Sequence, residues 1–247
     1  MIPVRVVSLP AMLKPDDYQG RTVVVFDVLR ATTTMAAAID AGVREIRVFD
    51  SIGACQLAAG GCSDLKLIAG EKDCLPPEGF DLGNSPGDYV AERCGGKTMF
   101  MSTTNGTRAL HAARGATKLL TGAIVNARAT ADAISRLGLP ATLLCAGTNG
   151  QIACEDLLGC GAVIARMRQP LLVNDEARAA LWLWEGSEPN LAVRLAECAG
   201  GQNVINAGLA VDVAFAAGID RFTHACQVID RDGVLVVSAA NAYDPVA

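Results

Sequence analysis

The sequence predicts an α/β protein of three layers, α/β/α, in which helices cover both faces of a mostly parallel central sheet. Two observations support this prediction. Short apolar runs rich in Val, Ile and Leu alternate along the 247 residues with alanine-rich segments of helical length. The apolar runs mostly lack the alternation of polar and apolar residues that marks a half-exposed strand, which is typical of strands covered on both faces.

The expected strands are short, rich in Val, Ile and Leu, and mostly without polar alternation: residues 4–9, 22–26, 45–49, 65–69, 98–101, 118–121 and 142–145. The expected helices are residues 33–41, 52–59, 86–93, 107–113, 127–137, 155–167, 174–183 and 191–211, with a break predicted at Gly200-Gly201. Asp232-Gly233 lies between two β-rich runs and predicts a hairpin, either an appendage to the sheet or its antiparallel edge. Because no Pro- or Ser-rich linker divides the chain, we expect one domain over residues 1–247.

Composition excludes several classes of function. Hydrophobic residues make up 51% of the chain, enough for a sizeable core, and the net charge of −5 argues against general nucleic-acid binding. No apolar run reaches the roughly 18 residues that span a bilayer, and the first residues lack the layout of a signal peptide. We therefore expect a cytoplasmic protein with neither nucleic-acid nor membrane partners. The charged fraction of 19% is below the roughly 25% of typical soluble chains, which favours a homodimer and an alanine-rich surface equally.

The nine cysteines include no Cys-x-x-Cys pair, so neither a zinc ribbon nor a thioredoxin motif is indicated. Several lie in apolar runs, as Cys145 does, which predicts reduced and buried thiols. His111 and His224 are the only histidines, and we expect both to be structural.

The loops after the strands are where chemistry is expected, because ligands of such sheets bind at the carboxyl ends of the strands. In the first of these loops Asp27 ends an apolar strand, and Arg30 and Thr32 follow as a helix begins. Helix starts bind anions, and Arg30 can hold a phosphate or sulfonate through two N–H donors. Asp27 can hold a cation beside that anion. The structural alternative is a threonine cap with Asp27 paired to Arg30.

Three further loops carry the same kinds of side chain. In the second, Glu71 ends a strand and Asn84-Ser85-Pro86 begins a helix with Ser85 as its cap. The third offers hydroxyl, amide and glycine donors that can cradle a phosphate: Thr103, Thr104, Asn105, Gly106, Thr107 and Arg108. The fourth repeats this set and continues to two carboxylates: Gly147, Thr148, Asn149, Gly150, Glu155 and Asp156. For Glu155, a role in the site and simple stabilisation of the helix dipole are equally supported.

The carboxylates Asp27, Glu71 and Asp156 are hard oxygen ligands, which suit magnesium better than zinc. Together with anion donors they indicate phosphoryl transfer to water. The haloacid dehalogenase pattern Asp-x-Asp is excluded because Leu29 stands at its second position. The spacing of a Walker A loop is also absent, so a nucleoside triphosphatase is not expected.

These motifs resemble the 2-phosphosulfolactate phosphatase (ComB) family. The resemblance rests on residues 27–32, Gly70-Glu71, residues 79–81 with 84–86, residues 103–108, and residues 146–148 with Gly150 and Asp156. Weaker matches continue at Asn126, Asp175, Gly208-Leu209 and Asp212, so that the whole pattern spans about residues 22–212 in the family's order.

The resemblance implies a three-layer α/β/α fold and a magnesium-dependent acid phosphatase. Its reaction converts 2-phospho-3-sulfolactate to 3-sulfolactate and phosphate in coenzyme M biosynthesis. Asp27, Arg30 and Glu71 are then the expected catalytic residues, and Asn126 joins the donor loops in binding substrate. Residues 72–78, with Pro76 and Pro77, depart from the family pattern and put the substrate rather than the hydrolysis in question.

Three questions stay open at the level of sequence. The nucleophile is either water or Asp27 itself, which would form a covalent intermediate. A small-anion binding protein without turnover could use the same loops, although metal carboxylates beside an anion site argue against it. A phosphosugar isomerase or lyase would need a positioned general base, and the sequence offers no good His or Lys candidate beside these loops.

Overall fold

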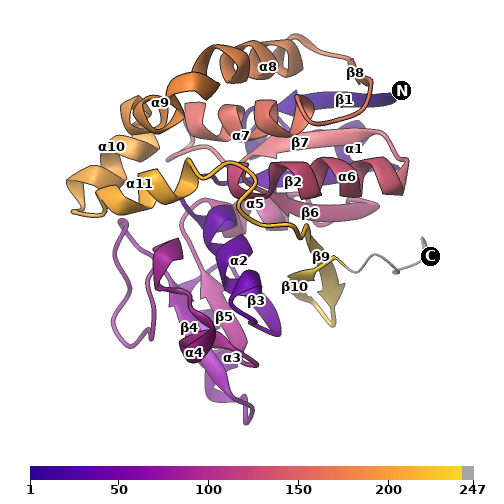
Figure 1. Ribbon diagram of the computed structural model, residues 1–247. Helices are drawn as coiled ribbons and strands as arrows, with labels where there is room; N and C mark the ends of the chain where they lie inside the picture. The colour runs from indigo at the N-terminus through magenta and orange to yellow at the C-terminus, as the bar shows by residue number, and fades with distance from the viewer. Residues whose placement is uncertain (241–247) are drawn as a thin grey trace.

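The computed structural model describes residues 1–240, and in them the strands form a single sheet of ten in the order β4-β5-β3-β10-β9-β6-β2-β7-β1-β8 (Figure 1). The strands are β1 (Ile2–Val7), β2 (Thr22–Phe26), β3 (Glu45–Phe49), β4 (Lys66–Gly70), β5 (Thr98–Ser102), β6 (Lys118–Gly122), β7 (Ala141–Cys145), β8 (Pro170–Leu172), β9 (Cys226–Arg231) and β10 (Val234–Ala239). The α/β class and the mostly parallel sheet predicted from sequence are confirmed, and seven predicted strands are present within two residues of their predicted ends.

The sheet consists of two parallel blocks. Strands β6, β2, β7, β1 and β8 run parallel to one another, as do β4, β5 and β3. Each strand in a sheet is rotated by roughly 20–25° against its neighbour, so the five steps from β2 to β5 accumulate to roughly a right angle. Figure 1 shows the result, with the first block drawn nearly horizontal and the second nearly vertical.

The hairpin of β9 and β10 joins the two blocks. Strand β10 pairs antiparallel with β3, and β9 pairs antiparallel with β6. The predicted hairpin is therefore present, but the predicted position as an appendage or edge is wrong, because the hairpin fills the middle of the sheet. Asp232 and Gly233 both have positive φ values, 52° and 88°, as the tight two-residue turn requires.

Helices cover both faces of the sheet, which explains why the strands lack polar alternation. Val23 and Val25 of β2 pack into one core cluster with α2 and α5, whereas Val24 and Phe26 pack into another with α6, α7 and α8. The longer helices are α2 (Ala31–Asp40), α3 (Ile52–Gly60), α5 (Gly106–Ala112), α6 (Ala127–Leu137), α7 (Cys154–Ile164), α8 (Asp175–Ser187), α9 (Leu191–Glu197), α10 (Ala199–Asn206) and α11 (Ala210–Ala216).

The remaining helical turns are short. They are α1 (Pro15–Tyr18), α4 (Ala91–Cys94), and the 3-10 turns at Pro10–Met12, Pro86–Asp88, Ile124–Asn126 and Glu188–Asn190. The helix predicted over residues 86–93 is wrong, since Pro86–Asp88 and α4 are separate turns there. None of the helices in residues 1–240 is long and apolar enough to cross a membrane.

The predicted break at Gly200-Gly201 is also wrong, because both glycines lie inside α10. The chain instead bends at Cys198 between α9 and α10. A Cβ atom on Gly201 would lie 1.9 Å from the carbonyl oxygen of Leu195, and one on Gly200 would lie 1.9 Å from Glu155 Oε1. These glycines therefore permit close packing rather than a turn.

Candidate functional site

The loops that follow β2, β4, β5 and β7 meet at one place, as the sequence predicts. The amide of Thr104 after β5 donates to Glu71 Oε1 after β4 over 2.7 Å. The amide of Asn149 after β7 donates to Asn105 Oδ1 after β5 over 3.4 Å. Although the two strand blocks run in opposite directions through the sheet, the bond between Asn149 and Asn105 shows that their carboxyl ends converge.

Asp27 lies at the centre of this convergence. It follows β2 directly, is 8% exposed, and accepts a hydrogen bond from the amide of Ala31 through Oδ1. A Cβ atom on Gly106 would lie 2.8 Å from Asp27 Oδ2. The glycine thus lets the start of α5 approach the carboxylate closely, a contact between the two strand blocks.

Burial raises the pKa of Asp27 to about 7. Hydrogen bonds from the amides of Ala31 and Gly106 oppose this rise, whereas the nearby charges of Glu71 and Glu155 add to it. A buried carboxylate surrounded by other carboxylates is costly to ionise, and such groups are concentrated at functional sites. The surroundings of Asp27 therefore fit a site that binds a cation.

Asp156, in the first turn of α7, ties two of the loops together. Its Oδ1 accepts from the amide of Val28 and its Oδ2 from the amide of Gly147, each over 2.9 Å. Burial, followed by the charges of Asp27 and Glu155, raises the pKa of Asp156 well above its usual range. Each oxygen already has a backbone donor, so this carboxylate holds the loops after β2 and β7 in register.

Glu155 has what Asp156 lacks, a carboxylate oxygen with no partner. The residue is 1% exposed, and its Oε2 is buried without a hydrogen bond among the described residues. Burial raises the pKa of Glu155, while the amide of Gly200 and the hydroxyl of Thr148 lower it. The sequence left its role open; the structure places it among the site carboxylates.

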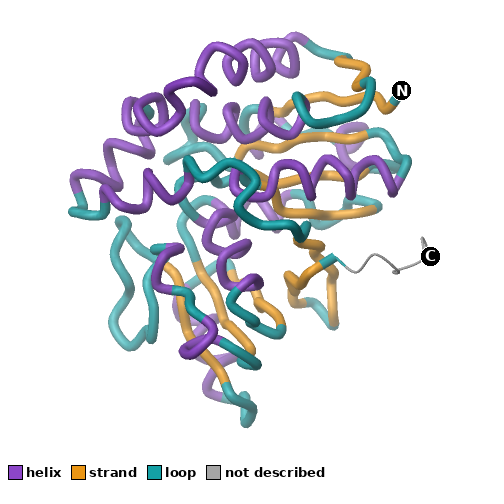
Figure 2. The backbone as a smooth tube through the Cα atoms, in the orientation of Figure 1, coloured by secondary structure: helices purple, strands orange, loops and turns teal. Residues whose placement is uncertain are grey.

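Glu71 joins the second loop to the third. Besides the bond to Thr104, its Oε2 accepts from the amide of Cys74 over 3.1 Å. Residues 71–85 contain no helix or regular strand and form the long loop beyond β4 in Figure 2. Glu71 fixes the start of this loop against the site.

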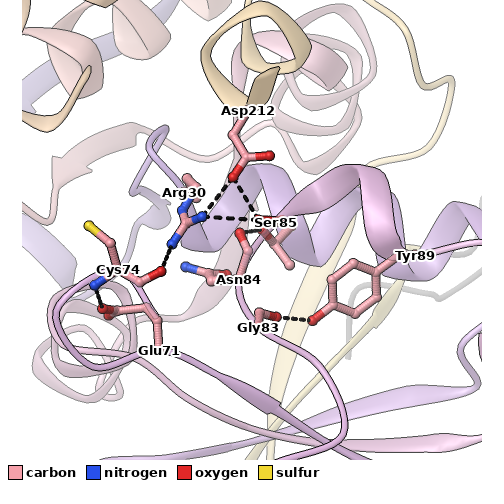
Figure 3. A network of polar contacts seen from close by, with 9 residues as sticks. Arg30, Glu71, Cys74, Gly83, Asn84, Ser85, Tyr89 and Asp212 are labelled. Atoms are coloured by element: carbon pink, nitrogen blue, oxygen red, sulfur yellow. Dashed lines mark hydrogen bonds and ion pairs between the residues drawn. The ribbon is translucent and has the colours of Figure 1, made fainter. Parts of the chain in front are cut away.

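Arg30 is held by three segments far apart in the sequence (Figure 3). Its Nη1 donates to Asp212 Oδ2 over 2.6 Å and to Ser85 Oγ over 3.2 Å, and its Nη2 donates to the carbonyl oxygen of Cys74 over 2.6 Å. The structural alternative that paired Arg30 with Asp27 is wrong, because Asp212 on α11 is the partner. The predicted cap at Ser85 is also wrong, since the Ser85 hydroxyl binds Asp212 instead.

Asn84 lies between Arg30 and Glu71 in Figure 3. It is 3% exposed, and its side-chain Oδ1 has no hydrogen-bond partner among the described residues. Its carbonyl oxygen accepts from the Thr34 hydroxyl over 2.8 Å, which fixes the backbone beneath α2. An unsatisfied buried amide costs roughly 1–3 kcal/mol, so its presence beside the site points to a ligand group as partner.

The third loop divides into structural and available groups. Thr103 and Thr107 are buried, and Thr103 Oγ1 accepts from the amide of Thr107, so these two hydroxyls begin α5. Thr104 and Asn105 remain partly exposed at the site. The Arg108 side chain is exposed and makes no hydrogen bond or ion pair within residues 1–240.

In the fourth loop, Gly147, Asn149 and Gly150 all have positive φ, which produces the tight turn that carries Thr148. Thr32 bridges both backbone polar groups of Asp27 through its hydroxyl. Asn126 is buried, and its side chain accepts from the amide of Ala123 and donates to the carbonyl oxygen of His224. These two bonds hold the start of α6.

A family model described as 2-phosphosulpholactate phosphatase matches residues 7–230 of this chain. The chain belongs to this family. A relative from Carboxydothermus hydrogenoformans, named "Probable 2-phosphosulfolactate phosphatase", is 35% identical over 240 residues, which cover 96% of this chain and 98% of the relative. A relative of the same name from Synechococcus sp. (strain JA-3-3Ab) is 38% identical over 221 residues, which cover 87% and 91%. The resemblance seen in the loop motifs is confirmed, and the chain is a phosphatase-family hydrolase.

In this member of the 2-phosphosulfolactate phosphatase family, the donor set fits magnesium as a partial coordination shell. Among residues 1–240, no group of three His, Cys, Asp or Glu side chains is arranged to hold a metal ion. Mg²⁺ nevertheless keeps several waters and usually takes one or two protein carboxylates besides the phosphate of its substrate. The repulsion that Asp27 experiences from Glu71, Glu155 and Asp156 is the excess charge that such a cation would offset.

The described surface also has an apolar pocket of about 430 Å³ between α7, α8 and α9. Cys154, Leu158 and Trp182 are among its walls, and none of the predicted site residues lines it. The family's chemistry is therefore sought at the convergence of the loops and not in this pocket.

Proposed function

We propose that this protein hydrolyses 2-phospho-3-sulfolactate to 3-sulfolactate and inorganic phosphate with the help of magnesium, a reaction of the coenzyme M biosynthetic type. The observation that carries the proposal is the convergence of four donor loops on the buried carboxylate of Asp27. Family membership supports the class of reaction, and the names of the relatives supply the substrate.

Asp27 and Glu71 are the residues that we propose as magnesium ligands. Asp156, the third candidate from the sequence, would contact the hydrated cation rather than complete a site of three carboxylates, because no such group of three is present among residues 1–240 and each of its oxygens already accepts one backbone hydrogen bond. When bound, the cation would polarise a phosphate oxygen and offset charge in the transition state. Without a cation, the site carboxylates would repel a substrate that carries a phosphate, a sulfonate and a carboxylate.

The anionic groups of the substrate are bound by donors from the surrounding loops. Arg30 supplies charge-assisted hydrogen bonds, whereas Asn84 Oδ1, which has no partner among residues 1–240, is an acceptor and suits a water or hydroxyl group rather than an anionic oxygen. Thr104 and Asn105 of the third loop and Thr148 of the fourth add neutral donors. With several loops of donors, one can hold the phosphate while another reads the sulfonate.

Water is the simplest nucleophile, and Asp27 as a covalent nucleophile is the alternative mechanism. The amides of Ala31 and Gly106 both bond the Asp27 carboxylate, so it would accept a proton from water or attack phosphorus through a lone pair that these amides leave open. Trapping a phosphorylated Asp27 after rapid acid quench would rule out the direct attack of water.

The test is phosphate release from racemic 2-phospho-3-sulfolactate and from a panel of phosphorylated hydroxy acids, with magnesium and with a chelator. We expect magnesium-dependent release that is fastest with the sulfonate, and loss of release in Asp27→Asn. Asp132→Asn is the matched control, because Asp132 is exposed on α6 away from the loops. Release from another ester alone would keep the phosphatase and reject the substrate, and release from none would favour a small-anion binding protein.

We also propose that the chain acts as one domain and as a homodimer. The support is the single sheet that includes strands from both ends of the described chain, and the low charged fraction of 19%. Sedimentation velocity at micromolar concentration tests the dimer, and a monomer there would reject it.

A further inference from the structure

A buried ion pair connects the C-terminal helices to the loop after β2. Arg30 Nη1 and Asp212 Oδ2 lie 2.6 Å apart, and both side chains are 2% exposed. The Ser85 hydroxyl donates to the same Asp212 oxygen over 2.8 Å. Three segments that are distant in sequence, at residues 30, 85 and 212, thus meet in one polar contact (Figure 3).

The guanidinium of Arg30 is only partly used by the protein. It has five N–H groups, and the hydrogen bonds to Asp212, Ser85 and the carbonyl oxygen of Cys74 use three of them. The two bonds from Nη1 leave that nitrogen without a further hydrogen, so the spare donors are on Nε and Nη2. These two nitrogens form the side edge of the guanidinium, which matches two oxygens of a phosphate or sulfonate.

We propose that Asp212 is a positioning residue: together with Ser85 it fixes Arg30 so that the side edge of the guanidinium binds one anionic group of the substrate. This inference rests on the proposed function and deepens it. Because Asp212 neutralises Arg30, binding here depends on the direction of the spare N–H groups more than on net positive charge. The orientation must therefore be set in advance, and Asp212 sets it.

Contacts on two sides of the buried Arg30 guanidinium keep it in one orientation. A guanidinium on a flexible side chain would otherwise sample several rotamers, and each would direct its donors differently. In this structure Asp212 holds one side of the group and the backbone of Cys74 holds the other. Asp212 also anchors α11, so the C-terminal helices are fastened to the binding loop through this pair.

The test compares Asp212→Asn, Asp212→Glu, Arg30→Gln and the double variant Arg30→Gln with Asp212→Asn. The readouts are the dissociation constants of inorganic phosphate and of sulfate by calorimetry, and kcat and KM for 2-phospho-3-sulfolactate. We expect Asp212→Asn to weaken anion binding and raise KM about tenfold, the loss of one charge-assisted hydrogen bond, while kcat changes less. Asp212→Glu should recover part of the loss.

Coupling gives the sharper criterion. If Asp212 acts through Arg30, the double variant should bind phosphate no worse than Arg30→Gln alone. Independent losses that multiply would overturn the proposal, and so would wild-type anion affinity in Asp212→Asn. Asp220→Asn is the matched control, because Asp220 also pairs with an arginine, Arg166, over 2.6 Å but away from the loops.

Two further measurements keep the result interpretable. If Asp212→Asn does not fold, Ser85→Ala removes one of the two contacts to Asp212 and should weaken phosphate binding by a smaller factor, whereas unchanged binding would count against the proposal. Phosphate binding is measured without turnover. A protein that binds phosphate through Arg30 but hydrolyses none of the panel would reject the proposed function and leave the positioning role intact.

Discussion

At the scale of single residues, Glu155 presents a conflict between stability and function. Its carboxylate is buried beside Asp27, its Oε2 has no hydrogen-bond partner within residues 1–240, and burial raises its pKa. A group that is costly in the folded state and lies in a functional site is often retained for activity. Glu155 is therefore the residue at which we expect the two properties to diverge.

We expect Glu155→Gln to raise the thermal stability of the metal-free protein, by up to about 1 kcal/mol, because the variant removes one charge from a crowded set of carboxylates. The same variant should lower magnesium-dependent phosphate release. Thermal unfolding in a chelator and a phosphate-release assay give the two numbers. Glu185→Gln, at an exposed position on α8, is the control and should change neither. A variant that is both less stable and fully active would contradict this view of Glu155.

Gly106 is the second residue whose identity follows from the site. A Cβ atom there would lie 2.6 Å from the Cβ of Ala31 and 2.8 Å from Asp27 Oδ2, closer than ordinary contacts allow. We expect Gly106→Ala to cost roughly 1–3 kcal/mol of stability through overpacking and to reduce activity by displacing Asp27. In Gly53→Ala, the control on α3, the new atom has no neighbour within 4 Å, so stability should stay or rise. Chemical denaturation of both variants measures the contrast.

At the scale of elements, the sequence predicted the strands well for a physical reason. Strands of a parallel sheet are covered on both faces, so many form a mostly apolar run with clear ends, as in β2 and β7. Gly200-Gly201 misled the prediction, because glycine permits either a turn or a close approach. Only the packing of Glu155 against α10 distinguishes the two.

The location of the site was predicted from the sequence, but its long-range contacts were not. That the loops after four strands share one site follows from the rule on strand ends, and the contacts of Glu71 and Asn105 agree with it. The pairing of Arg30 with Asp212 could not be predicted, because the two residues are 182 positions apart and no local pattern connects them. The central place of the β9–β10 hairpin was missed for the same reason.

Substituting Asp156 tests whether this residue stabilises the protein by holding two loops together or by contacting the metal. Because it accepts from the amides of Val28 and Gly147, we expect Asp156→Asn to lose about 1–3 kcal/mol of stability even in a chelator, since its amide nitrogen would face a backbone N–H. Denaturant unfolding in a chelator measures this cost, with the exposed Asp132→Asn as control. If Asp156→Asn lost stability only when magnesium is present, the loop-holding role would be rejected.

At the scale of the whole molecule, the carboxylates that form ion pairs outside the site and the carboxylates inside it make stability depend on pH in opposite directions. Glu45 is buried, which alone would raise its pKa, but hydrogen bonds from Arg231 and Arg47 bring the pKa below its usual value. A hydrogen bond from Arg114 lowers the pKa of Asp230. These groups lie where the hairpin joins β3 and α5, and their stabilisation is present above their unfolded pKa values and lost as the pH falls through the folded ones.

The site carboxylates make the metal-free protein less stable as the pH rises, and we expect bound magnesium to offset this loss. The folded pKa of Asp27 is about 7, well above its unfolded value near 4, so the folded protein binds more protons between these pH values. Stability of the metal-free protein should therefore fall as the pH rises from about 5 to 8. Magnesium prefers ionised carboxylates, so the increase in Tm that it produces should be larger at pH 8 than at pH 5.

Thermal unfolding across that pH range, in a chelator and in magnesium, measures both effects. Asp27→Asn removes one of the titrating site carboxyls, so it should make the chelator curve less steep and shrink the magnesium shift together. Asp132→Asn should preserve both. A magnesium shift that is equal at the two pH values, or an Asp27→Asn curve as steep as that of the wild type, would mean that Asp27 neither takes up the proton nor holds the cation. The metal would then have to be sought at Glu71 and Glu155.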